Sequence, residues 1–281
     1  MRIYFDSKDL INILEHSNPC TSNELKKYII NKKHKIVITS IIILEISEPL
    51  IMKSTKTNVM RLLNEIEKIP HVFINTANIT RLELLNAIDA YYKKNEYKDI
   101  YPFVRRFDQT LEKYGKPPTE ILLDYSMSKI VWDLYNEDAL DGFDKYAVKL
   151  RTVFSDERNL QKKPSLKRIF INTIKKHLLL FKLTPSPKRV ESFAEWIYKK
   201  PTRCPSIRLN YEVFHEMVKN IGDIPKDSDL EDLLHIQCLP YVDFMTVDRR
   251  FYAYVSQAAK NLNVSYDSKI RRSAKEILDL I

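Results

Sequence analysis

The sequence predicts an α/β protein with a parallel central sheet that is covered by helices on both faces and interrupted by a large helical insertion. Short apolar runs alternate with helical patterns near both ends of the chain, as in successive strand–helix units. Over residues 78–220, apolar and aromatic residues instead recur at helical spacing. We therefore expect two halves of one core, residues 1–77 and 221–281, on either side of an all-helical insertion or cap.

The first predicted strand and helix lie at the start of the chain. Residues 3–5 are a short apolar run that ends in Asp6, and residues 7–15 have a helical pattern. A turn then leads to Ser22, which we expect to cap a second helix that ends near residue 33.

Two further strands complete this half of the core. Residues 36–38 are β-branched and predict the second strand, after which Ser40 is expected to cap a helix that carries Glu45. Residues 58–68 are helical in pattern, and residues 71–74 predict the third strand.

The α/β pattern returns near the C-terminus. Ser228 is expected to cap a helix, residues 242–247 predict the last strand of the core, and residues 249–261 and 273–280 predict the two closing helices. Strands that alternate with helices in this way imply a parallel sheet.

The composition is that of a soluble protein with a sizeable core and excludes several classes of site. Of 281 residues, 44% are hydrophobic and 30% are charged. The three glycines are not adjacent, which excludes Gly-rich phosphate loops, and the three cysteines form no CxxC pair. The apolar runs are too short to span a membrane, and the first residues lack a signal-peptide pattern, so we expect a cytoplasmic protein that does not bind membranes.

Acidic residues recur where predicted strands end or predicted helices begin. These residues are Asp6, Glu45, Asp229, Asp232 and Asp248. Each one alone has an ordinary explanation as a helix-start or turn residue. Together they would meet at the carboxyl edge of a parallel sheet, where they repel one another unless a cation joins them. Carboxylate oxygens in such a cluster suit Mg²⁺ or Mn²⁺, and this chemistry matches phosphodiester cleavage.

The order of these motifs resembles the PIN-domain nucleases. The likeness rests on Phe5-Asp6-Ser7, on Thr39-Ser40 followed by Glu45, and most specifically on residues 232–250, where a helix leads through Leu-Pro-Tyr-Val-Asp into Thr246-Val247-Asp248. It covers residues 1–74 and 221–281, roughly half of the chain. The resemblance implies a three-layer α/β/α core.

The same resemblance implies a Mg²⁺- or Mn²⁺-dependent endonuclease, with RNA a better candidate substrate than DNA. Asp6, Glu45, Asp232 and Asp248 would be the catalytic, metal-binding tetrad, and Asp229 is a further catalytic candidate. Ribonucleases of this family occur in toxin–antitoxin modules, so an antitoxin-like or defence-system protein is a candidate partner. Whether the chain forms a homodimer stays open.

The positive charge of the chain is concentrated in the predicted insertion. Residues 161–203 contain twelve Lys or Arg and two Glu, and the whole chain has a net charge of +9. A local excess of this kind favours a surface that binds a polyanion. The candidate nucleic-acid contacts are Lys175, Lys176, Lys199, Lys200, Arg249 and Arg250.

Two alternatives to a nuclease stay open. A non-catalytic module with the same fold could bind nucleic acid or a protein through its basic helices, although it would have no need for all four acids. A helical interaction protein could expose the aromatic pairs Tyr91–Tyr92 and Phe193–Trp196, although aromatic residues at helical spacing are more often core. An aspartyl-phosphate phosphatase is disfavoured because Lys8 stands where that class needs a second Asp.

Overall fold

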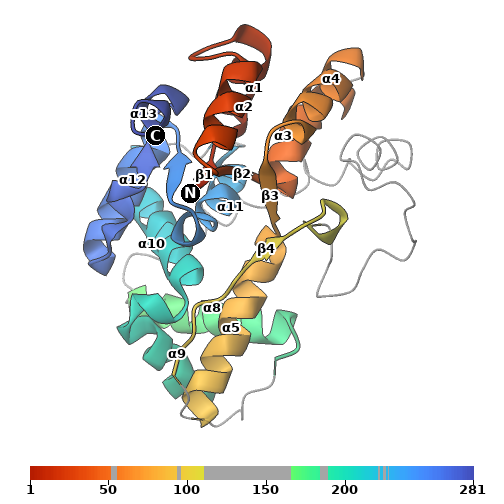
Figure 1. Ribbon diagram of the computed structural model, residues 1–281. Coiled ribbons are helices and arrows are strands. Elements are labelled where there is room, and N and C mark those ends of the chain that lie inside the picture. The colour runs from red at the N-terminus through yellow and green to blue at the C-terminus, as the bar shows by residue number, and fades with distance from the viewer. Residues whose placement is uncertain are drawn as a thin grey trace.

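A six-stranded sheet forms the centre of the protein (Figure 1). The computed structural model describes residues 1–51, 56–93, 96–110, 166–183, 189–220, 222–223, 226 and 228–281. The strand order is β4-β3-β2-β1-β5-β6, and every neighbouring pair is parallel except β3 and β4. The strands are β1 (Arg2–Tyr4), β2 (Lys35–Thr39), β3 (His71–Ile74), β4 (Phe103–Val104), β5 (Phe244–Thr246) and β6 (Ile270–Arg271). The predicted α/β class with a mostly parallel sheet is confirmed.

Strand β1 lies at the middle of this sheet and brings together the two ends of the chain. Ile3 pairs with Ile36 of β2 on one side and with Phe244 of β5 on the other. Because these three strands are parallel, the residues that follow β1 and β5 leave the sheet at the same edge. Asp6 and Asp248 are therefore neighbours in space although they are far apart in sequence.

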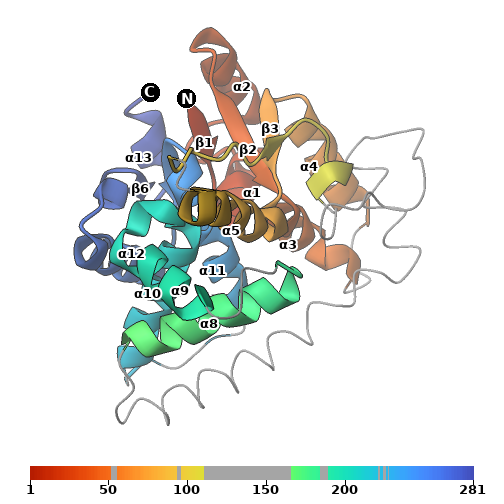
Figure 2. The ribbon, with the colours of Figure 1, turned by 90° about the horizontal axis from the view of Figure 1, so that it is seen from below.

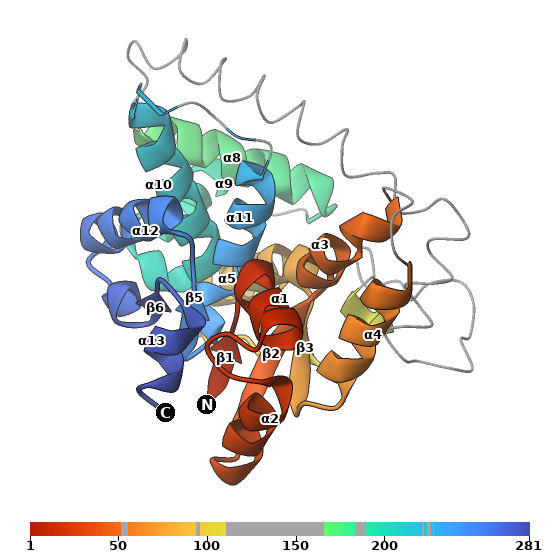
Figure 3. The same ribbon diagram turned by 90° about the horizontal axis from the view of Figure 1, so that it is seen from above.

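Helices cover both faces of the sheet. In Figure 3, α1 lies in front of the strands, whereas in Figure 2, from the opposite side, α5 lies in front of them. The helices are α1 (Ser7–His16), α2 (Ser22–Asn31), α3 (Ser40–Ile51), α4 (Lys56–Glu67), α5 (Thr76–Lys93), α8 (Leu166–Leu180), α9 (Val190–Lys199), α10 (Pro205–Lys219), α11 (Asp229–Ile236), α12 (Arg249–Leu262) and α13 (Ala274–Leu278).

The predicted helix caps are wrong by one residue or make no capping bond. Thr21, not Ser22, caps α2 in a capping box with Glu24, and Thr39, not Ser40, accepts a hydrogen bond from the backbone N–H of Ile42. Ser228 precedes α11 but its side chain makes no capping hydrogen bond. A capping residue stands outside the helix, so a helix that begins at a serine is capped by the residue before it.

The segment expected to be all-helical also contributes a strand. β4 pairs antiparallel with β3, so residues 78–220 are not helical throughout. β6 was not predicted either. Strands of two residues are too short to show the alternation by which a strand is recognised in sequence.

The rest of the described part of this segment consists mainly of helices and has its own hydrophobic core. Helices α5, α8 and α9 pack around Phe170, Ile174, Phe193 and Ile197, which are buried. The aromatic residues weighed as an exposed interaction surface pack against this core, and Phe193 belongs to it. The apolar pattern at residues 121–135 lies outside the described residues.

Helix α10 joins the two cores. Leu209, Val213 and Met217 pack into the core around the sheet, whereas Ile207 and Tyr211 pack into the core between α5, α8 and α9. The two sets lie on different faces of one helix because each follows the helical repeat. Among helices in the described part of the chain, none combines the length and apolar character needed to cross a membrane.

Candidate metal centre

Asp6 lies between β1 and α1, and it is the residue directly before the first residue of α1. Its side chain makes no capping hydrogen bond to α1. Instead its backbone N–H donates to Thr246 Oγ1 at 2.7 Å, and the hydroxyl of Ser7 lies 3.3 Å from one carboxylate oxygen. The Thr246 contact ties the end of β1 to the end of β5, so it fixes the backbone of Asp6 at the edge of the sheet where both strands end.

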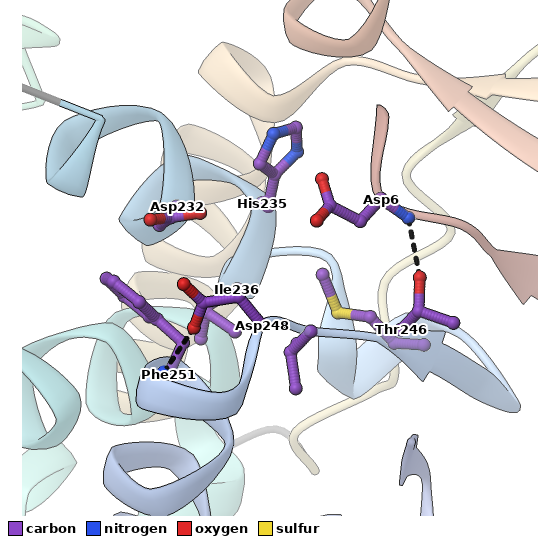
Figure 4. A pocket seen from close by; sticks show the side chains of 9 residues that line it. Asp6, Asp232, His235, Ile236, Thr246, Asp248 and Phe251 are labelled. Atoms are coloured by element: carbon purple, nitrogen blue, oxygen red, sulfur yellow. Dashed lines mark hydrogen bonds between the residues drawn. The ribbon is translucent and has the colours of Figure 1, made fainter. Parts of the chain in front are cut away.

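Asp248 and Asp232 complete a set of three carboxylates around one hollow (Figure 4). Asp248 follows β5 and caps α12, where it accepts a hydrogen bond of 2.6 Å from the backbone N–H of Phe251. Asp232 lies in the first turn of α11. The hollow has a cavity volume of about 10 Å³, which is room for one water molecule or one metal ion.

Glu45 is held next to this hollow by His235. Nε2 of His235 lies 3.0 Å from Glu45 Oε2, and Nδ1 is hydrogen-bonded to the hydroxyl of Tyr4. Potential ligand atoms of Asp6, Glu45 and His235 all lie within 4.8 Å of one another. Three members of the predicted tetrad, Asp6, Asp232 and Asp248, line the hollow. Glu45 lies beside Asp6 and His235, and Asp232 and Asp248 do not belong to that closer group.

His235 was not among the predicted site residues. It lies one helical turn after Asp232 and so on the same face of α11, and it is buried between Tyr4 and Glu45. The turn-spaced pair Asp232–His235 is visible in the sequence, but a histidine on a helix is more often a partly buried, hydrogen-bonded residue than a ligand, so the spacing alone does not assign it to the site.

The charges in the hollow shift one another's proton affinity. Burial, with the nearby carboxylates of Asp248, Asp6 and Glu45, raises the pKa of Asp232 to about 8, against the opposing effect of His235. Burial also raises the pKa of Asp6. Burial opposes charge on His235, but Glu45 and the neighbouring aspartates outweigh it and raise the pKa of His235 to about 9. Because the carboxylates raise the pKa of His235 against the effect of its burial, the electrostatic potential of the hollow is negative and favours cations.

Asp229 does not join this cluster. It is fully buried, accepts hydrogen bonds from both terminal nitrogens of Arg250, and also accepts one of 2.9 Å from the backbone N–H of Lys226. Its carboxylate therefore serves the ion pair with Arg250. The same pair removes Arg250 from the candidate nucleic-acid contacts, because its guanidinium is committed to internal carboxylates.

The other basic candidates lie on exposed surfaces. Lys176, Lys199 and Lys200 are exposed, and Lys175 is half-buried with its Nζ 3.7 Å from a carboxylate oxygen of Glu191. Arg249, at the start of α12, is exposed next to Asp248. Helices α8 and α9 therefore present several cations to solvent.

Comparison with protein-family models, with curated proteins and with solved structures finds no significant match to this chain. The residues of the site are therefore the basis for its chemistry. Three carboxylates around an ion-sized hollow, with a fourth held by a histidine, provide the oxygen donors that hard divalent cations prefer.

Proposed function

We propose that the protein is a Mg²⁺- or Mn²⁺-dependent endonuclease that hydrolyses phosphodiester bonds, with RNA as its substrate. The observation that carries this proposal is the convergence of Asp6, Asp232 and Asp248, from the ends of two parallel strands and the start of a helix, around one hollow of ionic size. The donors fit the ion because all three are carboxylates. The preference for RNA, and for an antitoxin-like or defence-system partner, rests on the resemblance of the motifs to PIN-domain ribonucleases.

Each side chain has a role in this proposal. Asp6, Asp232 and Asp248 would hold the divalent ion, which supplies the positive charge for water attack on phosphorus and for the leaving oxygen. Glu45 orients the attacking water, and His235 holds Glu45 in place through the 3.0 Å hydrogen bond. Tyr4 fixes the other nitrogen of the ring, so the imidazole cannot turn away.

The test is cleavage of labelled single-stranded RNA, and of DNA of the same sequence, with MnCl₂ or MgCl₂. We expect the wild-type protein to cleave RNA, EDTA to stop the reaction, and Asp6→Asn and Asp248→Asn to reduce cleavage to background because each removes a charged ligand. Asp267→Asn, which makes the same change at an exposed position, is the matched control and should cleave as the wild type does.

Two outcomes would contradict the proposal. Cleavage by Asp6→Asn or Asp248→Asn at the wild-type rate would remove the carboxylates from the reaction. A wild-type protein that binds RNA but cleaves neither nucleic acid with either ion would favour the non-catalytic binding module.

A further inference from the structure

Arg250 bridges two acidic residues, Asp223 and Asp229, which precede Asp232 in sequence. Its Nε donates to Asp223 Oδ2 at 2.6 Å, while Nη1 and Nη2 each donate to one carboxylate oxygen of Asp229, the latter at 3.1 Å. The side chain of Arg250 is 17% exposed and that of Asp229 is fully buried. A two-pronged contact of this kind fixes orientation as well as distance, which a lysine cannot do.

The position of this ion pair connects it with the hollow. Arg250 lies in the first turn of α12, two residues after Asp248, and Asp229 begins α11, three residues before Asp232. The pair therefore links the starts of the two helices that carry two of the three carboxylates. At the far end of α11, the hydroxyl of Ser206 donates to the backbone carbonyl of Gln237 at 2.8 Å. Helix α11 is thus held just before and just after the residues that it presents to the hollow.

Without a cation between them, these two helix starts would repel each other. The first turn of α11 contains Asp229, Glu231 and Asp232, and α12 follows Asp248 directly. The guanidinium of Arg250 supplies a positive charge at both helix starts, because it belongs to the first turn of α12 and is hydrogen-bonded to Asp229 at the start of α11. It neutralises Asp229 and leaves Asp232 and Asp248 to face the hollow.

We propose that Arg250 is a positioning residue that acts through Asp229 to hold Asp232 in the hollow that it lines with Asp6 and Asp248. This inference rests on the proposed metal-dependent function. It assigns Asp229 a supporting role in place of the catalytic role expected from the sequence. Arg250 then touches neither metal nor substrate, and its loss acts through the position of Asp232.

The test measures Mn²⁺ binding alone, by isothermal titration calorimetry, on full-length variants without nucleic acid. We expect Arg250→Lys to weaken Mn²⁺ binding about 10- to 100-fold, the usual effect of losing a group that orients a ligand. Arg61→Lys is the matched control, because Arg61 also lies near a carboxylate, that of Glu15 at 3.9 Å, but on α4. It should bind Mn²⁺ as tightly as the wild type.

Two further measurements separate positioning from a general loss of structure. Urea unfolding in EDTA gives the folded fraction of each variant, and the Mn²⁺ affinity is expressed per folded molecule. We also expect Arg250→Lys combined with Asp229→Asn to bind Mn²⁺ no more weakly than the weaker single variant, because both changes break the same contact.

The outcomes are distinct from those that test the proposed function. If the wild type binds no Mn²⁺, the proposed metal site is contradicted, and so is the positioning role of Arg250. If the wild type binds Mn²⁺ and folded Arg250→Lys binds it equally well, Arg250 has no positioning role and the metal centre stands. The inference would also be overturned if Mn²⁺ binding by Arg250→Lys decreased only as much as the fraction of folded protein. It would equally be overturned if the effects of Arg250→Lys and Asp229→Asn on Mn²⁺ binding added in the double variant.

Discussion

The protein contains two regions that place their charged side chains in different ways. We call β1–β6 with α1–α4 and α11–α13 the sheet region, and α5, α8 and α9 the helical region. In the sheet region, acidic residues at strand ends are individually held: the backbone N–H of Asp6 donates to Thr246, and the carboxylate of Asp248 accepts from the backbone N–H of Phe251. In the helical region, Lys176, Lys199 and Lys200 extend from helix surfaces into solvent.

The difference indicates what each region can do. A site that binds one ion needs donors fixed to a fraction of an ångström, and strand ends tied to their neighbours provide this precision. A surface that attracts a polyanion needs only several like charges within reach, because their attraction is non-directional and long-ranged. We therefore expect chemistry in the sheet region and the capture of nucleic acid on the helical region.

One buried residue, Glu83 of α5, connects the two regions. Its carboxylate accepts hydrogen bonds from the backbone N–H groups of Ser206, at 2.7 Å, and Ile207, at 3.1 Å, and from the hydroxyl of Tyr241. It thereby caps the N-terminus of α10, whose own preceding residue, Cys204, makes no side-chain cap. Tyr241 lies in the short turn (Leu239–Tyr241) between α11 and β5, so the contact reaches the segment that joins two of the elements around the candidate metal centre.

The first prediction is that removing the carboxylate of Glu83 lowers the stability of the protein more than any other change that we predict. Glu83→Ala leaves two buried N–H groups and one hydroxyl without their acceptor, and we expect it to lower the free energy of unfolding by about 4 kcal/mol. Urea denaturation measures this loss. The control is Glu195→Ala in α9, which removes an exposed ion pair with Lys167 and should change stability little. Equal stability of the two variants would show that Glu83 does not join the regions.

The second prediction concerns the pH dependence of this connection. Burial raises the pKa of Glu83 to about 7, against the opposing effects of its three hydrogen bonds. The folded protein thus holds a proton that the unfolded chain releases near pH 4.5, so stability falls as pH rises from about 4.5 to 7 and then levels off, by up to about 3 kcal/mol. Subtracting the profile of Glu83→Gln, which cannot titrate, isolates this contribution from the titration of Asp232 and Asp6. A difference profile that is flat, or rises with pH, would contradict the prediction.

The two regions also differ in how far the sequence predicts them. In the sheet region, short apolar runs predicted four of the strands. Acids at strand ends and helix starts predicted a cluster, and Asp6, Asp232 and Asp248 do line one hollow, with Glu45 beside it through His235, because parallel topology brings strand ends to one edge. The pairing of Asp229 with Arg250 was not predictable, since it depends on how α11 packs against α12. The same holds for Glu83, whose partners lie more than a hundred residues away.

The last prediction, which has the smallest expected effect, concerns RNA binding by the lysines of the helical region. Replacing Lys175, Lys176, Lys199 and Lys200 with Gln in an Asp6→Asn background, where no cleavage is expected, should weaken binding of single-stranded RNA about tenfold near physiological salt. It should also reduce the slope of log K against log salt by up to about 3, since each lost phosphate contact removes roughly 0.7. The matched control changes four lysines of the sheet region: Lys26 and Lys27 in α2, Lys32 directly after it, and Lys35 at the start of β2. Because both sets remove four positive charges, equal losses would mean that net charge governs RNA binding and that the helical region has no special role in it. A loss confined to the first set would mean that the lysines of α8 and α9 bind the RNA. The carboxylates of the sheet region would then have their proposed role in cleavage alone.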